Sequence, residues 1–242
     1  YFTYDGNFIM KTISRAEYRT MLSTLRDYHD YLVDNPDSLI TRYFGLHKIV
    51  MTSRNLERKT YYFVMMKNIF RTQKPLRYKF DLKGSTYKRE YPLRDPSKDV
   101  SSHILKDLNW VSLGLKLDLE EGDKWKLIDT IRKDSQFLNR INIIDYSLLI
   151  GVIEYRPSED DAANSSFTSS LHQPAEYQAT TVHSRDRKTT YLMGIIDTFT
   201  HFGAFKKCEA LFKRCLQGKG VSCVHPDKYA ARFADFVERQ FK

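Results

Sequence analysis

Apolar residues recur along the chain with two different periods, and these periods predict its strands and helices. Short runs rich in apolar, aromatic and β-branched residues predict β-strands. These runs cover residues 1–4, 8–13, 39–49, 61–70, 76–80 and 191–197. Because Asp5-Gly6 separates the first two runs, they are expected to form a hairpin with a tight turn.

Helical spacing of apolar residues predicts several helices. The first begins at Ser14, which forms a capping-box sequence with Glu17, and it ends before Asn35-Pro36. A second helix is expected to be capped by Asp123, and a closing helix is expected to open at Pro226. The inward-facing positions predicted for the second helix are Trp125, Ile128, Ile131 and Leu138.

Two polar stretches without periodicity interrupt this pattern. Residues 90–102 contain proline and charged side chains, a composition typical of a loop. Residues 156–188 are rich in Ser, Thr, Ala and His and include Glu159-Asp160-Asp161. A segment of that composition buries too little apolar surface to join a core, so we expect a mobile insertion there.

The composition fits one large globular domain or two small lobes. The 242 residues are 41% hydrophobic and 14% aromatic, enough to bury a substantial core. There is no apolar run of bilayer-spanning length and no signal-peptide pattern, and the missing initial methionine predicts a fragment of a longer protein. Three cysteines without CxxC spacing argue against a disulfide framework or a zinc site and favour a reducing compartment.

The net charge of +9 indicates a polyanionic partner: nucleic acid, a phosphorylated metabolite or an anionic membrane. Part of this charge gathers in residues 81–89, an acid, three bases, a glycine and two hydroxyls after a predicted strand. Burying so much charge is costly, so we expect an exposed corner. Gly84 would let the backbone approach a ligand, and Lys83, Lys88 and Arg89 would donate to phosphate oxygens. A solvated turn is the simpler alternative.

Two aspartates and a lysine suggest a nucleotide site. Asp197 ends an apolar strand, where a carboxylate can bind magnesium together with nucleotide phosphates, although strand-end caps are also common. Asp145 lies between two apolar runs, which favours either a satisfied structural aspartate or a functional one. Lys11 stands in the second predicted strand, where a lysine either faces solvent or reaches phosphates.

Three of these segments resemble motifs of the phosphatidylinositol phosphate kinases, lipid kinases that phosphorylate the inositol ring of a phosphoinositide. The segments are DLKGSTYKR at 81–89, IIDYSLL at 143–149 and GIID at 194–197, in the family's order. KDLNW at 106–110 resembles the family's KDLDF-type segment, and the text from 224 to 237 resembles its C-terminal end. Soluble inositol phosphate kinases share a related DxKxG pattern, which leaves a lipid-free headgroup as an alternative substrate.

The resemblance implies an α+β, two-lobed kinase-like fold with antiparallel sheets and an ATP cleft between the lobes. Residues 1–70 would form the N-terminal lobe and residues 71–242 the C-terminal lobe. The C-terminal lobe would carry the mobile insertion at about 156–188 and an activation and specificity segment at about 198–220. The family's glycine-rich phosphate loop would lie just before Tyr1 and is missing from the sequence.

The resemblance also implies roles for single residues. Asp145, Lys83 and Asp81 would form the catalytic group, and Asp197 would bind Mg²⁺. ATP would be held by four residues, of which the last two would line the adenine pocket: Lys11, Lys83, Met66 and Asn68.

A second set of residues is implied to contact the substrate and the membrane. Arg89, with Lys88, would hold a headgroup phosphate. Lys206 and Lys207 lie on the basic face of a predicted amphipathic helix after Gly203, which suits an anionic membrane surface. An ordinary solvated surface helix fits the same pattern.

The sequence around Glu209 is relevant to which phosphoinositide the protein would accept as substrate. Residues 206–209 read KKCE, the form found in the family branches that phosphorylate the 5-hydroxyl of phosphatidylinositol 4-phosphate. Thr200-His201, by contrast, is closer to the 4-kinase branch. The expected partner is a phosphoinositide on an anionic membrane at the cytoplasmic face, with a possible homodimer and no nucleic acid. A catalytically silent phosphoinositide-binding scaffold is the alternative function.

Overall fold

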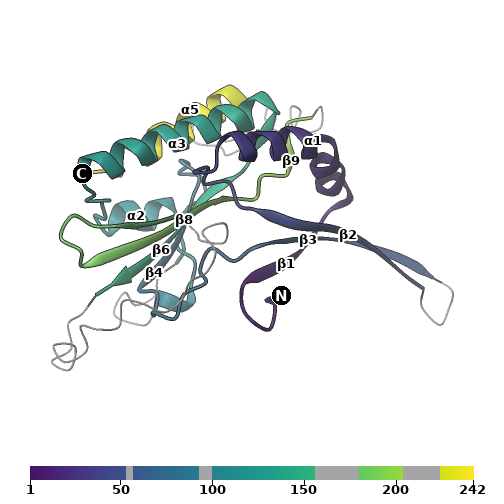
Figure 1. Cartoon of the computed structure of the whole chain (residues 1–242), viewed down its shortest axis with the longest axis horizontal. Coiled ribbons are helices and arrows are strands. Elements are labelled where there is room, and N and C mark those ends of the chain that lie inside the picture. The colour runs from purple at the N-terminus through teal and green to yellow at the C-terminus, as the bar shows by residue number, and fades with distance from the viewer. Residues whose placement is uncertain (53–56, 93–99, 156–179, 204–223) are drawn as a thin grey trace.

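The computed structural model describes residues 1–52, 57–92, 100–155, 180–203 and 224–242 (Figure 1). Its strands form antiparallel sheets, as expected. The smaller sheet has the order β1-β3-β2 and the larger sheet the order β4-β6-β8-β7, while β5 pairs with β9. The strands of the smaller sheet are β1 (Phe8–Ile13), β2 (Tyr43–Thr52) and β3 (Arg58–Lys67).

The remaining strands belong to the larger sheet and to the two-stranded pair. In the larger sheet they are β4 (Tyr78–Leu82), β6 (Ser147–Glu154), β7 (Thr180–His183) and β8 (Thr189–Ile196). The short pair consists of β5 (Ile143–Ile144) and β9 (Thr200–His201).

The first turn and the first helix form as the sequence predicts. Gly6 takes a φ of 68° in the turn before β1, a conformation that glycine adopts without strain. Helix α1 (Arg15–Asp34) begins with both bonds of a capping box: the Glu17 N–H donates to Ser14 Oγ at 3.2 Å, and the Ser14 N–H donates to Glu17 Oε2 at 2.6 Å. Tyr18 packs against an aromatic ring of β3, so α1 lies against the smaller sheet.

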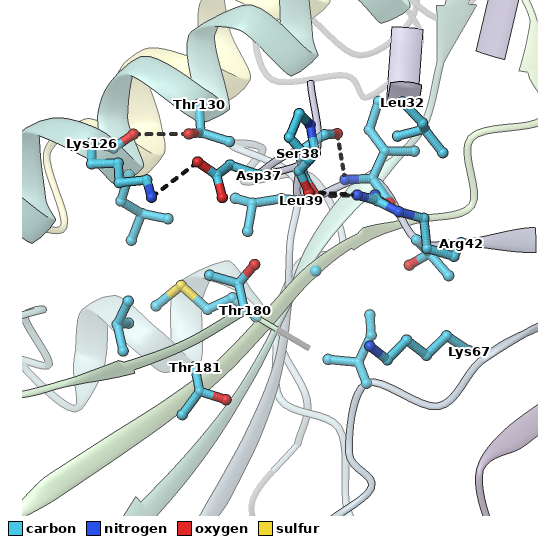
Figure 2. A pocket seen from close by; sticks show the side chains of 18 of the residues that line it. Leu32, Asp37, Ser38, Leu39, Arg42, Lys67, Lys126, Thr130, Thr180 and Thr181 are labelled. Atoms are coloured by element: carbon cyan, nitrogen blue, oxygen red, sulfur yellow. Dashed lines mark hydrogen bonds and ion pairs between the residues drawn. The ribbon is translucent and has the colours of Figure 1, made fainter. Parts of the chain in front are cut away.

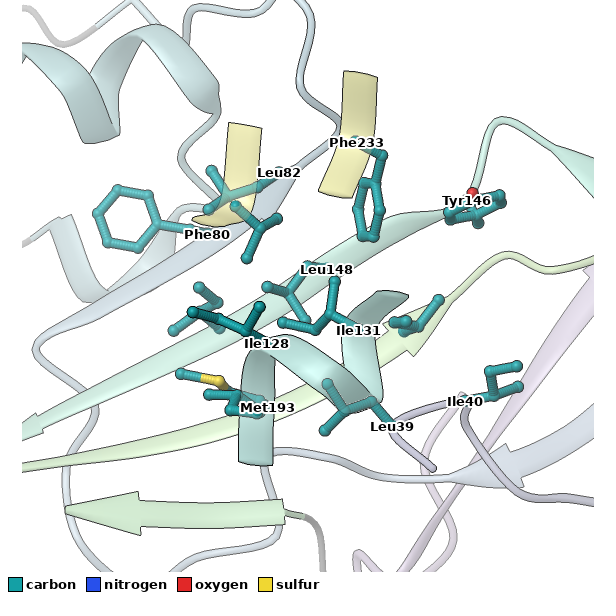
Figure 3. Packing of buried hydrophobic residues seen from close by; sticks show 14 of the residues in the cluster. Leu39, Ile40, Phe80, Leu82, Ile128, Ile131, Tyr146, Leu148, Met193 and Phe233 are labelled. Carbon is teal, nitrogen blue, oxygen red and sulfur yellow. The ribbon is translucent and has the colours of Figure 1, made fainter. Parts of the chain in front are cut away.

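The main core lies between the larger sheet and two long helices. These helices, α3 (Glu121–Arg140) and α5 (Pro226–Glu238), run together over one face of that sheet in Figure 1. Figure 3 shows Ile128 and Ile131 of α3 next to Leu148 of β6, with Phe233 of α5 on the other side of Leu148. Each fully buried side chain of this size contributes roughly 1.5–3 kcal/mol to folding.

Two shorter helical segments complete the described fold. The 3₁₀ turn η1 (Val100–Ser102) precedes α2 (Asp107–Ser112). Trp110 of α2 is buried and meets Phe80 of β4 edge to face, with 4.8 Å between ring centroids. Within the described residues, no helix is both long and apolar enough to cross a membrane.

Several predicted details differ from the structure. Helix α3 starts at Glu121, with Glu120 at its N-cap, so the predicted cap at Asp123 is wrong. Three acidic residues within four positions, Glu120, Glu121 and Asp123, left the start ambiguous. Trp125 is 61% exposed, whereas Ile128, Ile131 and Leu138 are buried as predicted. The expected insertion also ends earlier than residue 188, because Thr180–His183 pair with β8.

The segment between α1 and β2 connects the two sheets. We predicted a strand from Leu39, but β2 begins at Tyr43. Leu39 and Thr41 instead bond to the backbone of Ile195 in β8, with the Ile195 N–H donating to Leu39 O at 2.7 Å and the Thr41 N–H to Ile195 O at 2.9 Å. This short parallel bridge holds residues 39–41, which lead into β2 of the smaller sheet, against β8 of the larger sheet.

Candidate functional site

The larger sheet brings three of the predicted site residues to one end of adjacent strands. Lys83 directly follows β4, Asp145 lies between β5 and β6, and Asp197 directly follows β8. In the register of this sheet Leu82 lies opposite Leu148, and Ser147 lies opposite Ile196. The three side chains therefore leave the sheet at the same edge.

Lys83 and Asp145 form an ion pair at this edge. The Lys83 ammonium donates to Asp145 Oδ1 at 2.8 Å and to the Asp145 carbonyl oxygen at 2.7 Å. The Lys83 side chain is 13% exposed, whereas that of Asp145 is 42% exposed. The lysine is thus held in place while the carboxylate still faces solvent, where it can accept a proton or bind a ligand.

A second ion pair reaches this edge from the other sheet. Lys11 of β1 donates to Asp197 Oδ1 at 2.5 Å, and both side chains are partly exposed. The Lys11 ammonium also lies 5.1 Å from the centre of the Phe199 ring, which attracts a cation. Lys11 and Asp197 are 186 residues apart in sequence, so this pair assembles only when both sheets are in place.

Both aspartates have an unusual backbone conformation. The φ angle is 66° at Asp145 and 63° at Asp197, in the left-handed region that costs most L-residues about 1–2 kcal/mol. Aspartate and asparagine tolerate it better than other residues with a side chain. Strained positions of this kind cluster at functional sites, so these two deviations support a site at this edge.

A residue that we did not assign, Asp107, holds the charged loop that follows β4. It opens α2 and is 1% exposed. Its Oδ1 accepts the backbone N–H groups of Lys83, Gly84 and Ser85 at 3.0, 2.7 and 3.3 Å. The acidic residue at the start of KDLNW was the available signal, but its sequence does not show which loop it contacts.

Arg89 binds the same aspartate from the far end of the loop. Its Nε donates to Asp107 Oδ2 at 2.7 Å, and an Nη donates to Asp81 Oδ1 at 2.6 Å and to the Asp81 carbonyl oxygen. The Arg89 side chain is only 11% exposed. In this structure Arg89 and Asp81 therefore brace the loop, while Lys88 is exposed and lies over the ring of Tyr87.

Helix α5 supports the loop from behind. Gly84 has a φ of 65°, and a Cβ there would lie 3.0 Å from the Arg232 carbonyl oxygen and 3.0 Å from Phe236 Cβ. The glycine thus permits close approach of the loop backbone to α5. The predicted approach of this backbone to a ligand stays a prediction. Burial raises the pKa of Tyr229 well above its ordinary value, so its hydroxyl stays protonated and donates to the carbonyl of Tyr146, next to Asp145, at 2.5 Å.

The two residues expected at the adenine pocket lie at the end of β3. Met66 and Asn68 are both buried. The Asn68 amide donates to the Gly6 carbonyl at 2.8 Å, and its Oδ1 accepts the Phe70 N–H at 3.0 Å. The Asn68 side chain therefore secures the N-terminal hairpin to the connection between the sheets.

The predicted membrane and specificity residues have no described position in the structure. Lys206, Lys207 and Glu209 lie outside the described residues, as does most of the expected activation and specificity segment. Among the residues that are described, no group of three or more His, Cys, Asp or Glu side chains could hold a metal ion. Asp197 is a single carboxylate, which suits Mg²⁺ because this ion often takes one or two protein carboxylates and completes its shell with water and substrate phosphates.

Comparisons with known proteins cover the whole chain. Residues 1–177 and 158–240 match the family model described as phosphatidylinositol-4-phosphate 5-kinase. The chain is 32% identical over 260 residues to a phosphatidylinositol 4-phosphate 5-kinase of Plasmodium falciparum; the match covers 100% of this chain and 15% of that protein. It is 26% identical over 272 residues to the chicken phosphatidylinositol 5-phosphate 4-kinase type-2 alpha, covering 97% of this chain and 65% of the relative. The human type-2 gamma enzyme is also 26% identical, over 284 residues, with 99% and 66% coverage.

Proposed function

Because the chain belongs to the phosphatidylinositol-4-phosphate 5-kinase family, we propose that it is the catalytic region of a lipid kinase that transfers the ATP γ-phosphate to the inositol ring of a phosphatidylinositol phosphate. The observation that carries this proposal is the Lys11–Asp197 ion pair. It joins the smaller sheet to the edge of the larger sheet that also carries Lys83 and Asp145. Two cations and two carboxylates at one edge are the groups that phosphoryl transfer requires.

We assign a separate role to each of these four side chains. Lys11 and Lys83 bind and neutralise ATP phosphates, and Asp197 holds Mg²⁺, which supplies further charge neutralisation when bound. Asp145 orients the inositol hydroxyl and accepts its proton, because its carboxylate is exposed while Lys83 fixes its position. Positioning and electrostatic stabilisation then supply most of the rate, as expected for a transfer with little covalent chemistry by the protein.

The charged loop would present the substrate side of the site. Lys88 is exposed and free to approach a headgroup phosphate, whereas Arg89 is already paired with two carboxylates. We therefore give Lys88 the direct contact and Arg89 the task of holding the loop. Lys206 and Lys207 would contribute attraction to an anionic membrane, each cation near the surface adding about 1 kcal/mol.

Phosphatidylinositol 4-phosphate is the favoured substrate, with the 4,5-bisphosphate as product. The KKCE sequence and the similarity to the Plasmodium falciparum 5-kinase support this choice. The second candidate is phosphorylation of phosphatidylinositol 5-phosphate at its 4-hydroxyl. The 4-kinase relatives that match along almost the whole chain and the Thr200-His201 text favour that candidate.

A substrate panel tests the proposal and separates these candidates. Radiolabelled ATP and Mg²⁺ would be incubated with vesicles that each contain one phosphatidylinositol monophosphate, and the product isomer would be identified by chromatography. We expect label in the 4,5-bisphosphate from the 4-phosphate substrate. Label from the 5-phosphate alone would select the 4-kinase reaction, and vesicle binding without any label would support a silent scaffold.

A further inference from the structure

A cavity of about 510 Å³ lies apart from the two ion pairs of the proposed active site. Its walls come from the segment that joins α1 to β2, from the end of β3, from α3 and from β7 and β8. None of the four residues of the two ion pairs, Lys11–Asp197 and Lys83–Asp145, lines it. A cavity of this volume fits a small organic molecule.

Two cations, Arg42 and Lys67, face this cavity. Figure 2 shows Lys67 reaching from β3 into the hollow below Arg42, with Thr180 and Thr181 on its opposite side. Arg42 donates to the carbonyl oxygens of Ser38 and Ile40 at 3.1 and 2.7 Å and to that of Pro36 at 2.9 Å, which fixes the guanidinium at the cavity wall. Within the described part of the chain, no carboxylate forms an ion pair with either cation.

The acidic residues of the cavity wall do not offset these two charges. Asp37 pairs with Lys126 at 3.0 Å, at the opposite end of the cavity from Lys67 in Figure 2. Asp123 is exposed in the first turn of α3. Burial, together with the neighbouring Arg42, lowers the pKa of Lys67 to about 8.

The wall contains a further unsatisfied group. Thr41 is 4% exposed, and its hydroxyl has no hydrogen-bond partner among the described residues. A buried hydroxyl without a partner destabilises the fold, so a ligand or a water that reaches it would stabilise the protein. The wall also has an aliphatic part, which includes Leu32, Leu39, Ile69, Leu127, Val182 and Met193.

We propose that this cavity binds a small organic anion, whose phosphate or carboxylate group lies between Lys67 and Arg42 and whose apolar part lies against the aliphatic wall. Such an anion supplies the negative charge that these two side chains lack. Because the walls come from both sheets, the bound anion would also stabilise their present arrangement. The site is separate from the proposed active site, so its occupancy can be measured without a kinase assay.

Site-resolved acetylation of lysines tests this proposal. The chain would be treated at about pH 8 with limiting reagent, with inorganic phosphate or hexanoate added at constant ionic strength, and each lysine would be quantified by mass spectrometry. An anion that raises the pKa of Lys67 by about one unit would lower its acetylation about fivefold. Lys48, exposed on β2, is the matched control and should not change.

The two probes separate the sources of the anionic group. Protection by phosphate alone would identify a phosphate site, and protection by hexanoate alone a carboxylate site with an apolar body; either result supports the proposal. Equal acetylation of Lys67 with and without both anions would overturn it, as would equal protection of Lys48. Hexanoate should also raise the Tm of the Lys48→Met variant more than that of Lys67→Met, and equal rises would contradict the hexanoate site.

Discussion

Asp145 and Asp197 combine a carboxylate at the sheet edge with a backbone conformation that few L-residues adopt. The carboxylate carries the role proposed for each residue in phosphoryl transfer. The positive φ affects the stability of the turn in which the residue lies. Replacing such an aspartate by alanine would change both at once. Asparagine keeps the left-handed preference and removes only the charge, so it isolates the chemical role.

We expect Asp197→Asn to lower lipid phosphorylation by about 100-fold or more, because it removes the charge assigned to Mg²⁺. Its free energy of unfolding should stay close to that of the wild type. Asp197→Ala should lose the same activity and about 1 kcal/mol of stability as well, since alanine is strained at a φ of 63°. Kinase assays and urea unfolding measure the two effects.

Asp27→Asn, at an exposed position of α1, is the matched control and should change neither quantity. Full activity in Asp197→Asn would contradict the assignment of this carboxylate to the metal. Equal stability of the asparagine and alanine variants would instead contradict the strain at this position.

The residue types of the site could be predicted from sequence, but their partners could not. Asp197 was selected at the end of a predicted strand, Asp145 between two apolar runs and Lys11 within a strand. The role of Lys83 came from the resemblance of its motif to the family, and in the structure two ion pairs connect these four residues. Asp107 was not selected, because its contacts with the loop at 83–85 depend on how α2 packs against β4. The local sequence offers an acidic residue there but does not show which loop it contacts.

Among the structural elements, the loop after β4 and helix α5 depend on each other. Gly84 brings the loop backbone against α5, and the Tyr229 hydroxyl of the same helix holds the carbonyl that follows Asp145. The C-terminal helix therefore positions two of the three motifs that suggested the family. A change at this contact should affect both stability and activity.

We expect Gly84→Ala to destabilise the protein by about 1–3 kcal/mol, because a Cβ would be strained at positive φ and would press on the backbone of α5. Gly122→Ala is the matched control. Gly122 lies in α3 with open space around it, so alanine there should be neutral or should stabilise by up to about 1 kcal/mol. Thermal unfolding of both variants measures the difference, and equal Tm values would show that the contact with α5 is not formed.

Local sequence signals predicted the elements well where a single cap or period defines them. The capping box at Ser14 and the proline at Pro226 gave the starts of α1 and α5. The apolar run that begins at Leu39 predicts a strand from that residue. Its backbone bonds to β8 instead, and the spacing of apolar residues does not reveal such a contact. Trp125 fits a helical apolar stripe, yet its side chain is exposed in the folded protein.

The molecule as a whole is held together partly by a buried carboxylate. Asp134 of α3 accepts hydrogen bonds from the Tyr31 hydroxyl at 2.7 Å, the Ser38 hydroxyl at 2.7 Å and the Leu39 N–H at 2.8 Å. These donors belong to α1 and to the segment that leads into the smaller sheet. Burial raises the pKa of Asp134 to about 6 despite these bonds.

This raised pKa predicts a dependence of stability on pH. Protonated Asp134 suits the folded state better than the charged form, so its contribution is fully present below the unfolded pKa of about 3.8 and is lost as pH rises through about 6. The loss amounts to about 3 kcal/mol. Asp134→Asn should therefore flatten the pH dependence of the free energy of unfolding between about pH 4 and 7.

Urea unfolding across this pH range tests the prediction. Asp129→Asn, on the exposed side of α3, is the matched control and should keep the slope of the wild type. The asparagine at position 134 is expected to lower stability overall, because its amide cannot accept all three bonds. An unchanged slope in that variant would show that Asp134 is charged throughout the range.

The Lys11–Asp197 pair has a consequence for biosynthesis. Its two members are separated by 186 residues, so a ribosome must complete most of this region before the second one emerges. Until then the growing polypeptide carries the lysine of this pair but not its carboxylate. The contact between the two sheets that this ion pair makes can therefore form only after translation has passed Asp197.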